Sequence, residues 1–121
     1  MKTKEQLAAD LAQCTGTMNY WKQPPLPFQY TDGIKTFCEG AEAYWFLSEL
    51  LDFIDIFKKN YLSVIKLKVA NSAATIKVIG DNDEVAITRQ IVFTDCPEGE
   101  YVFYMYWKDS ERPMLIWRSE R

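Results

Sequence analysis

The sequence predicts an α+β fold in which N-terminal helices pack on a five-stranded antiparallel meander sheet. Apolar residues recur with the 3.6-residue period of a helix in residues 1–60, and with the two-residue period of a strand in residues 61–121. The chain has 121 residues, of which 48% are hydrophobic, enough for one core of its own. We therefore expect residues 1–121 to form a single domain.

Two short helices are expected near the N-terminus. Residues 4–14 carry leucines at helical spacing, so this helix can lean on the core. The side chain of Thr31 or Asp32 is suited to cap a second helix over about 33–39, which Gly40 interrupts. Both helices are too short to be stable alone and must pack against the rest of the chain.

The principal helix is expected over about 41–59. Its core-facing stripe at helical spacing comprises Leu47, Leu50, Leu51, Ile54 and Phe57. Trp45 and Ile56 lie on the opposite side of this helix, at about 100° per residue. They need cover, either from the preceding loop or from another chain.

The loop over residues 15–33 contains the segment Pro24-Pro25-Leu26-Pro27, whose fixed φ angles exclude a helix or an interior strand. A polar linker would not carry aromatic residues, yet this loop has four: Tyr20, Trp21, Phe28 and Tyr30. We expect an ordered loop that buries some of its rings.

Five strands joined by short turns are expected in the second half, in meander order: 64–69, 75–79, 85–93, 101–107 and 114–117. The fourth of these strands is aromatic on both faces, with Tyr104 and Tyr106 on one face and Phe103 and Trp107 on the other. It is therefore either central and partly covered on both sides, or its outer face meets a partner.

Composition excludes several classes of function. The net charge is −3 and basic residues are interleaved with acidic ones, which argues against direct nucleic-acid binding. No apolar run is long enough to span a membrane, and no signal peptide is visible, so we expect a cytoplasmic protein. Cys14, Cys38 and Cys96 are widely spaced, which predicts buried thiols rather than a disulfide framework or a zinc site.

Histidine is absent from the chain. This excludes Ser-His-Asp and Cys-His catalysis within the chain, and histidine-based metal sites. The acidic segment at residues 80–84 lacks the spacing of a calcium loop and is read as a hairpin turn. We therefore expect no enzymatic activity, no metal and no cofactor.

Aromatic residues make up 15% of the chain, and three interpretations of them stay open: core, protein interface or small-ligand pocket. The residues predicted to form an interface with a partner or in a homodimer are Tyr20, Trp21, Trp45, Ile56, Tyr104, Tyr106 and Trp117. The residues that could contact a small ligand are Tyr30, Asp32 and Tyr44.

Three motifs carry a resemblance: Thr15-Gly16-Thr17-Met18-Asn19-Tyr20, then Tyr30-Thr31-Asp32-Gly33, then Ala43-Tyr44-Trp45. In this order and spacing they resemble an uncharacterised family of small bacterial and phage proteins. The resemblance covers residues 11–55 and implies a domain of unknown function that is frequent on mobile elements, in a bacterial or phage-infected cell. It implies no cofactor and no assigned activity.

Two functional hypotheses follow. The first is a non-enzymatic protein-binding module, encoded by a phage or mobile element, that modulates or inhibits a host defence protein such as a CRISPR nuclease. It depends on the small size, the acidic charge, the excess of rings and the missing catalytic groups. The second is a small-ligand binding domain or a carboxylate-dependent enzyme, with a pocket near Asp32 and Trp45.

Overall fold

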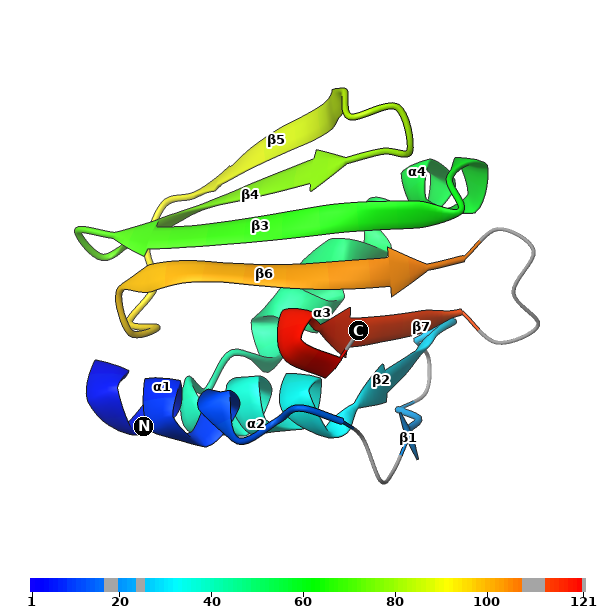
Figure 1. Ribbon diagram of the computed structural model, residues 1–121. Coiled ribbons are helices and arrows are strands. Elements are labelled where there is room, and N and C mark those ends of the chain that lie inside the picture. The colour runs from blue at the N-terminus through cyan, green and yellow to red at the C-terminus, as the bar shows by residue number, and fades with distance from the viewer. Residues whose placement is uncertain (17–19, 24–25, 108–112, 121) are drawn as a thin grey trace.

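The fold is described from a computed structural model, which describes residues 1–16, 20–23, 26–107 and 113–120. Within these residues, seven strands form one mixed sheet in the order β1-β2-β7-β6-β3-β4-β5 (Figure 1). Neighbouring strands are antiparallel except β2 and β7, which are parallel. The strands are β1 (Tyr20–Trp21), β2 (Gln29–Thr31), β3 (Leu62–Ala70), β4 (Ala73–Ile79), β5 (Val85–Ile91), β6 (Gly99–Tyr106) and β7 (Met114–Trp117).

The helices lie on one side of this curled sheet. In Figure 1, α3 and α4 lie behind the sheet, and α2 runs beside α1 along its lower border. The helices in the described residues are α1 (Lys4–Ala12), α2 (Asp32–Gly40), α3 (Tyr44–Leu51) and α4 (Ile54–Lys59), and a 3-10 turn, η1 (Arg118–Glu120), follows β7. None of these helices is long and apolar enough to cross a membrane.

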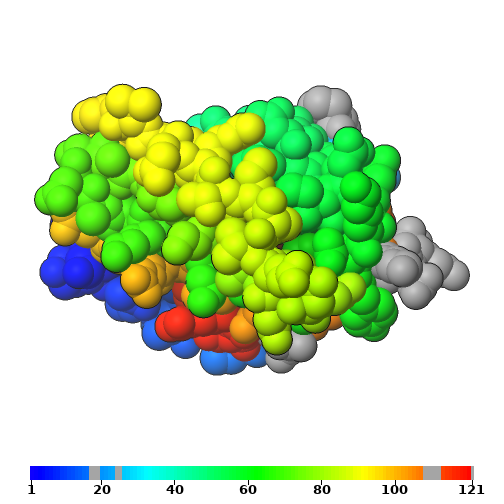
Figure 2. Space-filling view, turned by 90° about the horizontal axis from the view of Figure 1, so that it is seen from above, coloured from blue at the N-terminus to red at the C-terminus, as the bar shows by residue number. Residues whose placement is uncertain are grey.

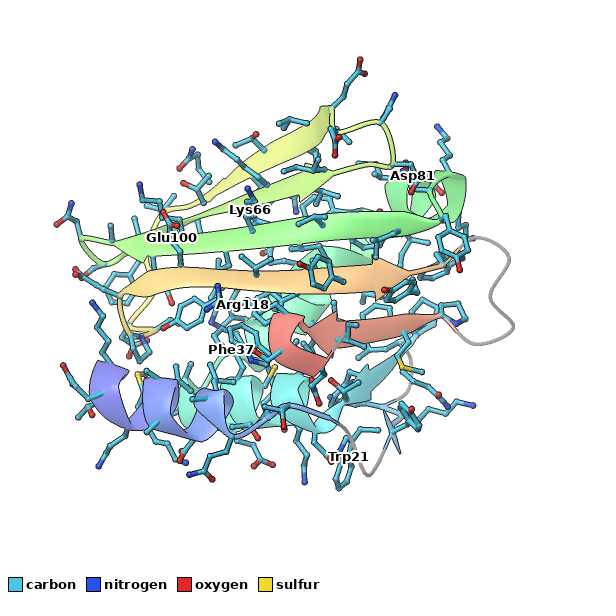
Figure 3. All side chains as sticks on the ribbon, in the orientation of Figure 1. Trp21, Phe37, Lys66, Asp81, Glu100 and Arg118 are labelled. Carbon is cyan, nitrogen blue, oxygen red and sulfur yellow. The ribbon has the colours of Figure 1, made fainter. Side chains whose placement is uncertain are left out.

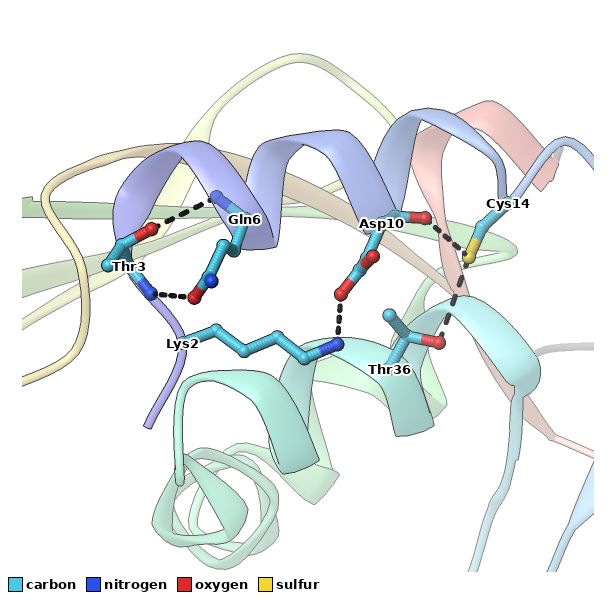
Figure 4. Close-up of polar contacts among 6 residues, drawn as sticks. All are labelled: Lys2, Thr3, Gln6, Asp10, Cys14 and Thr36. Atoms are coloured by element: carbon cyan, nitrogen blue, oxygen red, sulfur yellow. Dashed lines mark hydrogen bonds and ion pairs between the residues drawn. The ribbon is translucent and has the colours of Figure 1, made fainter.

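Helix α1 begins at a reciprocal cap and is attached to α2 (Figure 4). Gln6 N donates to Thr3 Oγ1 over 3.2 Å, and Thr3 N donates to Gln6 Oε1 over 3.0 Å, so two backbone donors at the helix start are satisfied. At the other end, Cys14 Sγ lies 3.8 Å from Thr36 Oγ1 of α2. Gly40 gives the close approach of the two helices, because a Cβ there would lie 2.8 Å from Leu7 Cδ1.

The core is built from rings that α2, α3 and β6 contribute. The ring of Phe37 in α2 lies 5.2 Å from that of Phe103 and 4.9 Å from that of Tyr101, both in β6. Phe46 of α3 lies 4.9 Å from Phe103, so the three elements meet at one aromatic cluster. Buried ring pairs of this kind contribute beyond the area that they bury, by about 0.5–1.5 kcal/mol each.

The predicted five-stranded meander is wrong in two respects. Residues 15–33 supply two further strands, β1 and β2, and β2 joins the sheet in parallel with β7. The five predicted strands are present and mutually antiparallel, but β6 does not pair with β5; it returns to lie between β3 and β7. β6 has the central place in the sheet that one of the two predicted alternatives gave it, because it pairs with β3 and with β7; in the described residues, α3 packs on one of its faces.

The single helix predicted over 41–59 is also wrong, because α3 and α4 are separated at Asp52 and Phe53. The break turns Phe53 into the core, where it is 1% exposed. Phe46 and Phe53 are fully buried instead of Leu51 and Ile54, which are half-buried. Leu47, Leu50 and Phe57 of the predicted stripe do lie in the core.

The loop before α2 buries part of its aromatic set, as predicted. Phe28 and Tyr30 belong to the core, and Tyr30 Oη donates to Gln23 Oε1 over 3.1 Å. Pro24 and Pro25 lie outside the described residues.

Candidate functional site

One face of the sheet is packed against helices, and the other is left open among the described residues. Alternate residues of β3, β4 and β6 enter the core, for example Ile65, Ile76 and Phe103. In Figure 3, Lys66 and Glu100 stand on the opposite side of the sheet, away from α3. We call this surface the open face; it comprises Leu62, Val64, Lys66, Lys68, Thr75, Lys77, Ile79, Thr88, Gln90, Glu100, Val102, Tyr104, Tyr106, Met114 and Ile116.

One half of the open face is apolar. Tyr104 lies between Val64 of β3 and Ile116 of β7, and Tyr106 lies between Leu62 and Met114. Ile79 continues the first of these rows on β4, beside Val64. Ile116 is buried and the other side chains of these rows are half-buried, and the ring of Tyr106 also lies 6.2 Å from that of Tyr61. We call this set the apolar half: Leu62, Val64, Ile79, Tyr104, Tyr106, Met114 and Ile116.

The other half of the open face is basic. Lys66 and Lys77 lie directly opposite each other on β3 and β4, and in the part of the chain that the structure describes neither forms an ion pair. Lys68, next on β3, lies 4.0 Å from Glu100 Oε1, a pair so exposed that it contributes little. A depression of about 590 Å³ is hollowed here, and its lining includes these three lysines, Thr75, Thr88 and Gln90. We call the three lysines and this depression the lysine half.

A second polar arrangement joins the start of α2 to the C-terminal turn η1. The carboxylate of Glu120 accepts three hydrogen bonds: from Thr31 Oγ1 at 2.5 Å, from Gly33 N at 3.1 Å and from Trp117 N at 3.1 Å. An anion at the start of a helix is stabilised by free backbone N–H groups and by the helix dipole. A Cβ on Gly33 would lie 2.6 Å from Trp117 Cβ, so glycine is required for this close approach.

Asp32, between these residues, is engaged with the β1 strand. Trp21 Nε1 donates to Asp32 Oδ1 over 2.8 Å, and Lys35 Nζ lies 3.7 Å from the centre of the Trp21 ring. The cation over the ring and the indole hydrogen bond hold Trp21 against the first turn of α2. Trp21 and Asp32, predicted from the sequence as interface and ligand residues, therefore contact each other.

The comparison with family models decides what the chain is similar to. The model of a family of unknown function, DUF6876, matches residues 5–121. The chain belongs to this family. No curated protein and no solved structure matches it.

Family membership agrees with the resemblance that the sequence motifs carry, and the structure shows what two of the motifs do in this member of DUF6876. Tyr30-Thr31-Asp32-Gly33 places Tyr30 in the core and lets Thr31, Asp32 and Gly33 bind Glu120 and Trp21. Ala43 is buried where the chain turns from α2 into α3, and its N–H donates to Cys38 O over 2.8 Å. Thr17, Met18 and Asn19 of the remaining motif lie outside the described residues.

The structure distributes the predicted interface residues over several surfaces. Tyr104 and Tyr106 lie together on the open face, whereas Tyr20 is exposed on β1. Trp45 and Ile56 are half-buried, and both pack against the core from α3 and α4. Trp117 is 5% exposed, because it faces the helices and its ring lies 5.5 Å from that of Phe103. This placement removes Trp117 from the predicted surface: it is a core residue of the single chain.

The predicted ligand pocket does not form as one group. Tyr30 and Tyr44 share the neighbourhood of Glu39 in the last turn of α2, where burial, followed by the nearby Glu39 charge, raises the pKa of Tyr44 to about 12. Asp32 begins the same helix and Trp45 follows its end, so the length of α2, about 12 Å at 1.5 Å per residue, separates them.

The acidic turn that joins β4 to β5 has a structural role. Asp81 accepts hydrogen bonds from Tyr61 N at 2.7 Å and from Leu62 N at 2.8 Å, and Asp81 N donates to Asn60 Oδ1. The turn thereby holds the entry into β3. Among the described residues, no group of three or more histidine, cysteine or acidic side chains is arranged to bind a metal.

Sequence reasoning missed the lysine half. The signal was present, because Lys66, Lys68 and Lys77 all stand at the outward positions of the alternating pattern in β3 and β4. The negative net charge of the whole chain gave no sign of this basic surface, because acidic residues elsewhere in the chain outnumber the three lysines.

Proposed function

We propose that this chain is a non-enzymatic protein-binding module whose open face docks on a partner. The observation that supports this proposal most directly is the apolar half itself, a contiguous set of side chains around Tyr104 and Tyr106 on the side of the sheet away from α3. Contiguous apolar surface on a soluble domain marks interaction sites, and tyrosine is enriched in the cores of protein interfaces.

The chemistry of the open face indicates the chemistry of the partner. Unpaired lysines directly opposite each other across two strands repel, which lowers the stability of the isolated chain by a few tenths of a kcal/mol. A partner that presents carboxylates beside apolar side chains would relieve this repulsion and cover the rings at the same time. We therefore infer an acidic protein surface as the partner, rather than a basic one.

The narrower form of the proposal is that the partner is a host defence protein, such as a CRISPR nuclease, in a bacterial or phage-infected cell. It follows from the family resemblance and not from the geometry. On this view the chain acts by occupying a surface of the partner, and the identity of the captured protein tests it.

Affinity capture from the organism that carries the gene tests the proposal. Three tagged proteins are compared: the wild type, the open-face variant Tyr104→Ala/Tyr106→Ala, and the control Tyr20→Ala/Tyr44→Ala. The control removes two exposed tyrosines that lie off the open face, on β1 and α3. Thermal unfolding first shows that all three are folded.

The proposal predicts a protein that the wild type and the control retain and that the open-face variant loses. Equal retention by all three proteins would contradict it. Capture of a nucleic acid instead, released by added salt and lost in Lys66→Glu/Lys77→Glu, would also contradict it and would make the lysine half a phosphate-binding surface.

A further inference from the structure

The last strand of the sheet, β5, has an unpaired outer edge. In the described residues it pairs with β4 alone, so the outer backbone N–H and C=O groups of a seven-residue strand face solvent. Figure 2 looks onto this edge, where residues of β4, β5 and the segment after them form the surface with no other element over them. At the opposite border of the sheet, β1 is only two residues long.

Two of the usual protections of an edge strand, proline and outward lysine, are missing from β5, and the strand is not short. A β-bulge in its pairing with β4 leaves Ala86 without a partner there, near the start of the strand, and residues 87–91 pair regularly. Residues 85–93 contain no proline and no lysine, and their only charge is Arg89. Arg89 is turned onto α3, with Nη1 at 2.8 Å from Glu49 Oε2 and 2.5 Å from Asp52 Oδ2. The edge is therefore uncharged where a second strand would approach.

Both ends of this edge carry exposed apolar side chains. Val85, at its start, is 55% exposed, and Val92 and Phe93, just past its end, are 92% and 71% exposed. An antiparallel partner strand with the same sequence would bring Val85 of each copy beside the Val92–Phe93 end of the other. In a two-fold symmetric dimer, this contact between apolar side chains forms at both ends of the interface. A parallel copy would instead place the start of one strand beside the start of the other. The β5 edge is therefore complementary to an antiparallel copy of itself.

We propose that two copies of this chain pair through their β5 edges, antiparallel about a two-fold axis at Thr88, to form one continuous sheet. In this register Ile87 lies opposite Arg89 of the other copy, and Ala86 lies opposite Gln90. Thr88 stands on the open face beside Lys77. The two lysine halves then meet across the axis, with the two Lys77 positions three strand spacings, about 14 Å, apart. The dimer joins both open faces into one surface.

Cysteine cross-linking tests the proposal at its axis. Residues directly opposite in an antiparallel pair have Cα atoms about 4.5–5.5 Å apart, within the range of a disulfide. Thr88→Cys is expected to form a covalent dimer under mild oxidation, whereas the wild type and the exposed control Ser119→Cys stay uncrosslinked. Ala86→Cys mixed with Gln90→Cys is expected to cross-link more than either variant alone.

Sedimentation provides the second readout. The wild type is expected to sediment as a dimer, and Val92→Lys/Phe93→Lys as a folded monomer, because two charges are placed at each end of the interface. A wild type that is monomeric at about 100 µM, a concentration that would reveal even weak association, overturns the proposal. So does a dimer in which none of positions 86, 88 and 90 cross-links. Neither cross-linking nor sedimentation depends on Tyr104 or Tyr106. The dimer proposal can therefore be refuted without refuting the proposed function, and the reverse also holds.

Discussion

Glu120 shows at the scale of one residue how the C-terminal turn is fastened to the rest of the fold. Its carboxylate accepts from a hydroxyl and two backbone N–H groups that come from β2, α2 and β7. Hydrogen bonds to a charged acceptor contribute about 1.5–3 kcal/mol in favourable settings. Thr31 and Gly33 therefore have a structural role, which is to bind the Glu120 carboxylate.

We predict that Glu120→Gln lowers the free energy of unfolding by about 1–3 kcal/mol, because the new amide turns a donor toward backbone donors. Urea unfolding measures this loss, and Glu84→Gln, in an exposed turn, is the matched control. Gly33→Ala should destabilise by a similar amount, since its methyl group would overlap Trp117 and Glu120. If Glu120→Gln unfolds at the same urea concentration as the control, the anchoring role is wrong.

The three thiols should differ in reactivity. Burial raises the pKa of Cys38 and of Cys96 to about 12, whereas Cys14 is only half-buried, with a pKa that burial also raises. At pH 8 the thiolate fraction at a pKa of 12 is on the order of 10⁻⁴, so Cys38 and Cys96 stay protonated and unreactive. Mass spectrometry after brief alkylation should find label on Cys14 first, and equal label on all three after unfolding. Early label on Cys38 would contradict its placement in the core.

Among elements, the strands were more predictable from the sequence than their order. Alternation of apolar residues marks each strand locally, and β3, β4, β6 and β7 lie close to their predicted ranges. No local sequence pattern indicates that β6 lies between β3 and β7. Its position depends on whether the chain, after β5, pairs with the free edge of β5 or with that of β3. The break at Asp52 and Phe53 has no proline or glycine to announce it, so tertiary packing of Phe53 overrides the helical period.

The same limit applies to the candidate site. Tyr104 and Tyr106 could be singled out because β6 is aromatic at successive positions, which one covered face cannot explain. The lysine half could not, because it depends on the cross-strand register of Lys66 with Lys77. Trp117 was wrongly predicted to lie at an interface. β7 has only four residues, and the alternation of side chains along so short a strand does not indicate which of its faces packs against α2.

The helix break leads to a prediction for α3. Leu47 is 2% exposed and Leu51 is half-buried, although the continuous-helix prediction placed both in the core. Leu47→Ala should cost about 2–5 kcal/mol of stability, the usual range for a buried leucine, and Leu51→Ala clearly less. Chemical unfolding of the two variants measures the difference. A larger loss of stability for Leu51→Ala would contradict this placement and support the single helix predicted over 41–59.

The lysine half leads to a prediction for the β3–β4 pair. Lys77→Glu replaces a repulsive pair with Lys66 by an attractive one, so the isolated chain should be more stable by about 0.2–1 kcal/mol. The same change should weaken binding of an acidic partner. Thermal unfolding checks the first effect, with Lys22→Glu, exposed and outside the helices and strands, as control. A destabilised Lys77→Glu would mean that Lys77 has a favourable partner.

At the scale of the whole molecule, charge is distributed unevenly between the two sides. The helices and the turns between them carry exposed carboxylates such as Glu5, Glu42, Asp52 and Asp55, whereas the open face carries Lys66, Lys68 and Lys77. A net charge of −3 therefore conceals one basic surface. This asymmetry would orient the chain as it approaches an acidic partner, and the encounter rate should fall as salt is added.

Titration of the captured partner tests the central claim, that the open face is the binding surface. Tyr104→Ala, measured by calorimetry beside the wild type and the control Tyr44→Ala, isolates one ring at the centre of the apolar half. A buried interface tyrosine contributes about 2 kcal/mol or more, so we predict a loss of affinity of roughly thirtyfold for Tyr104→Ala and none for Tyr44→Ala. An unchanged affinity for Tyr104→Ala, or a loss confined to Tyr44→Ala, would contradict the account.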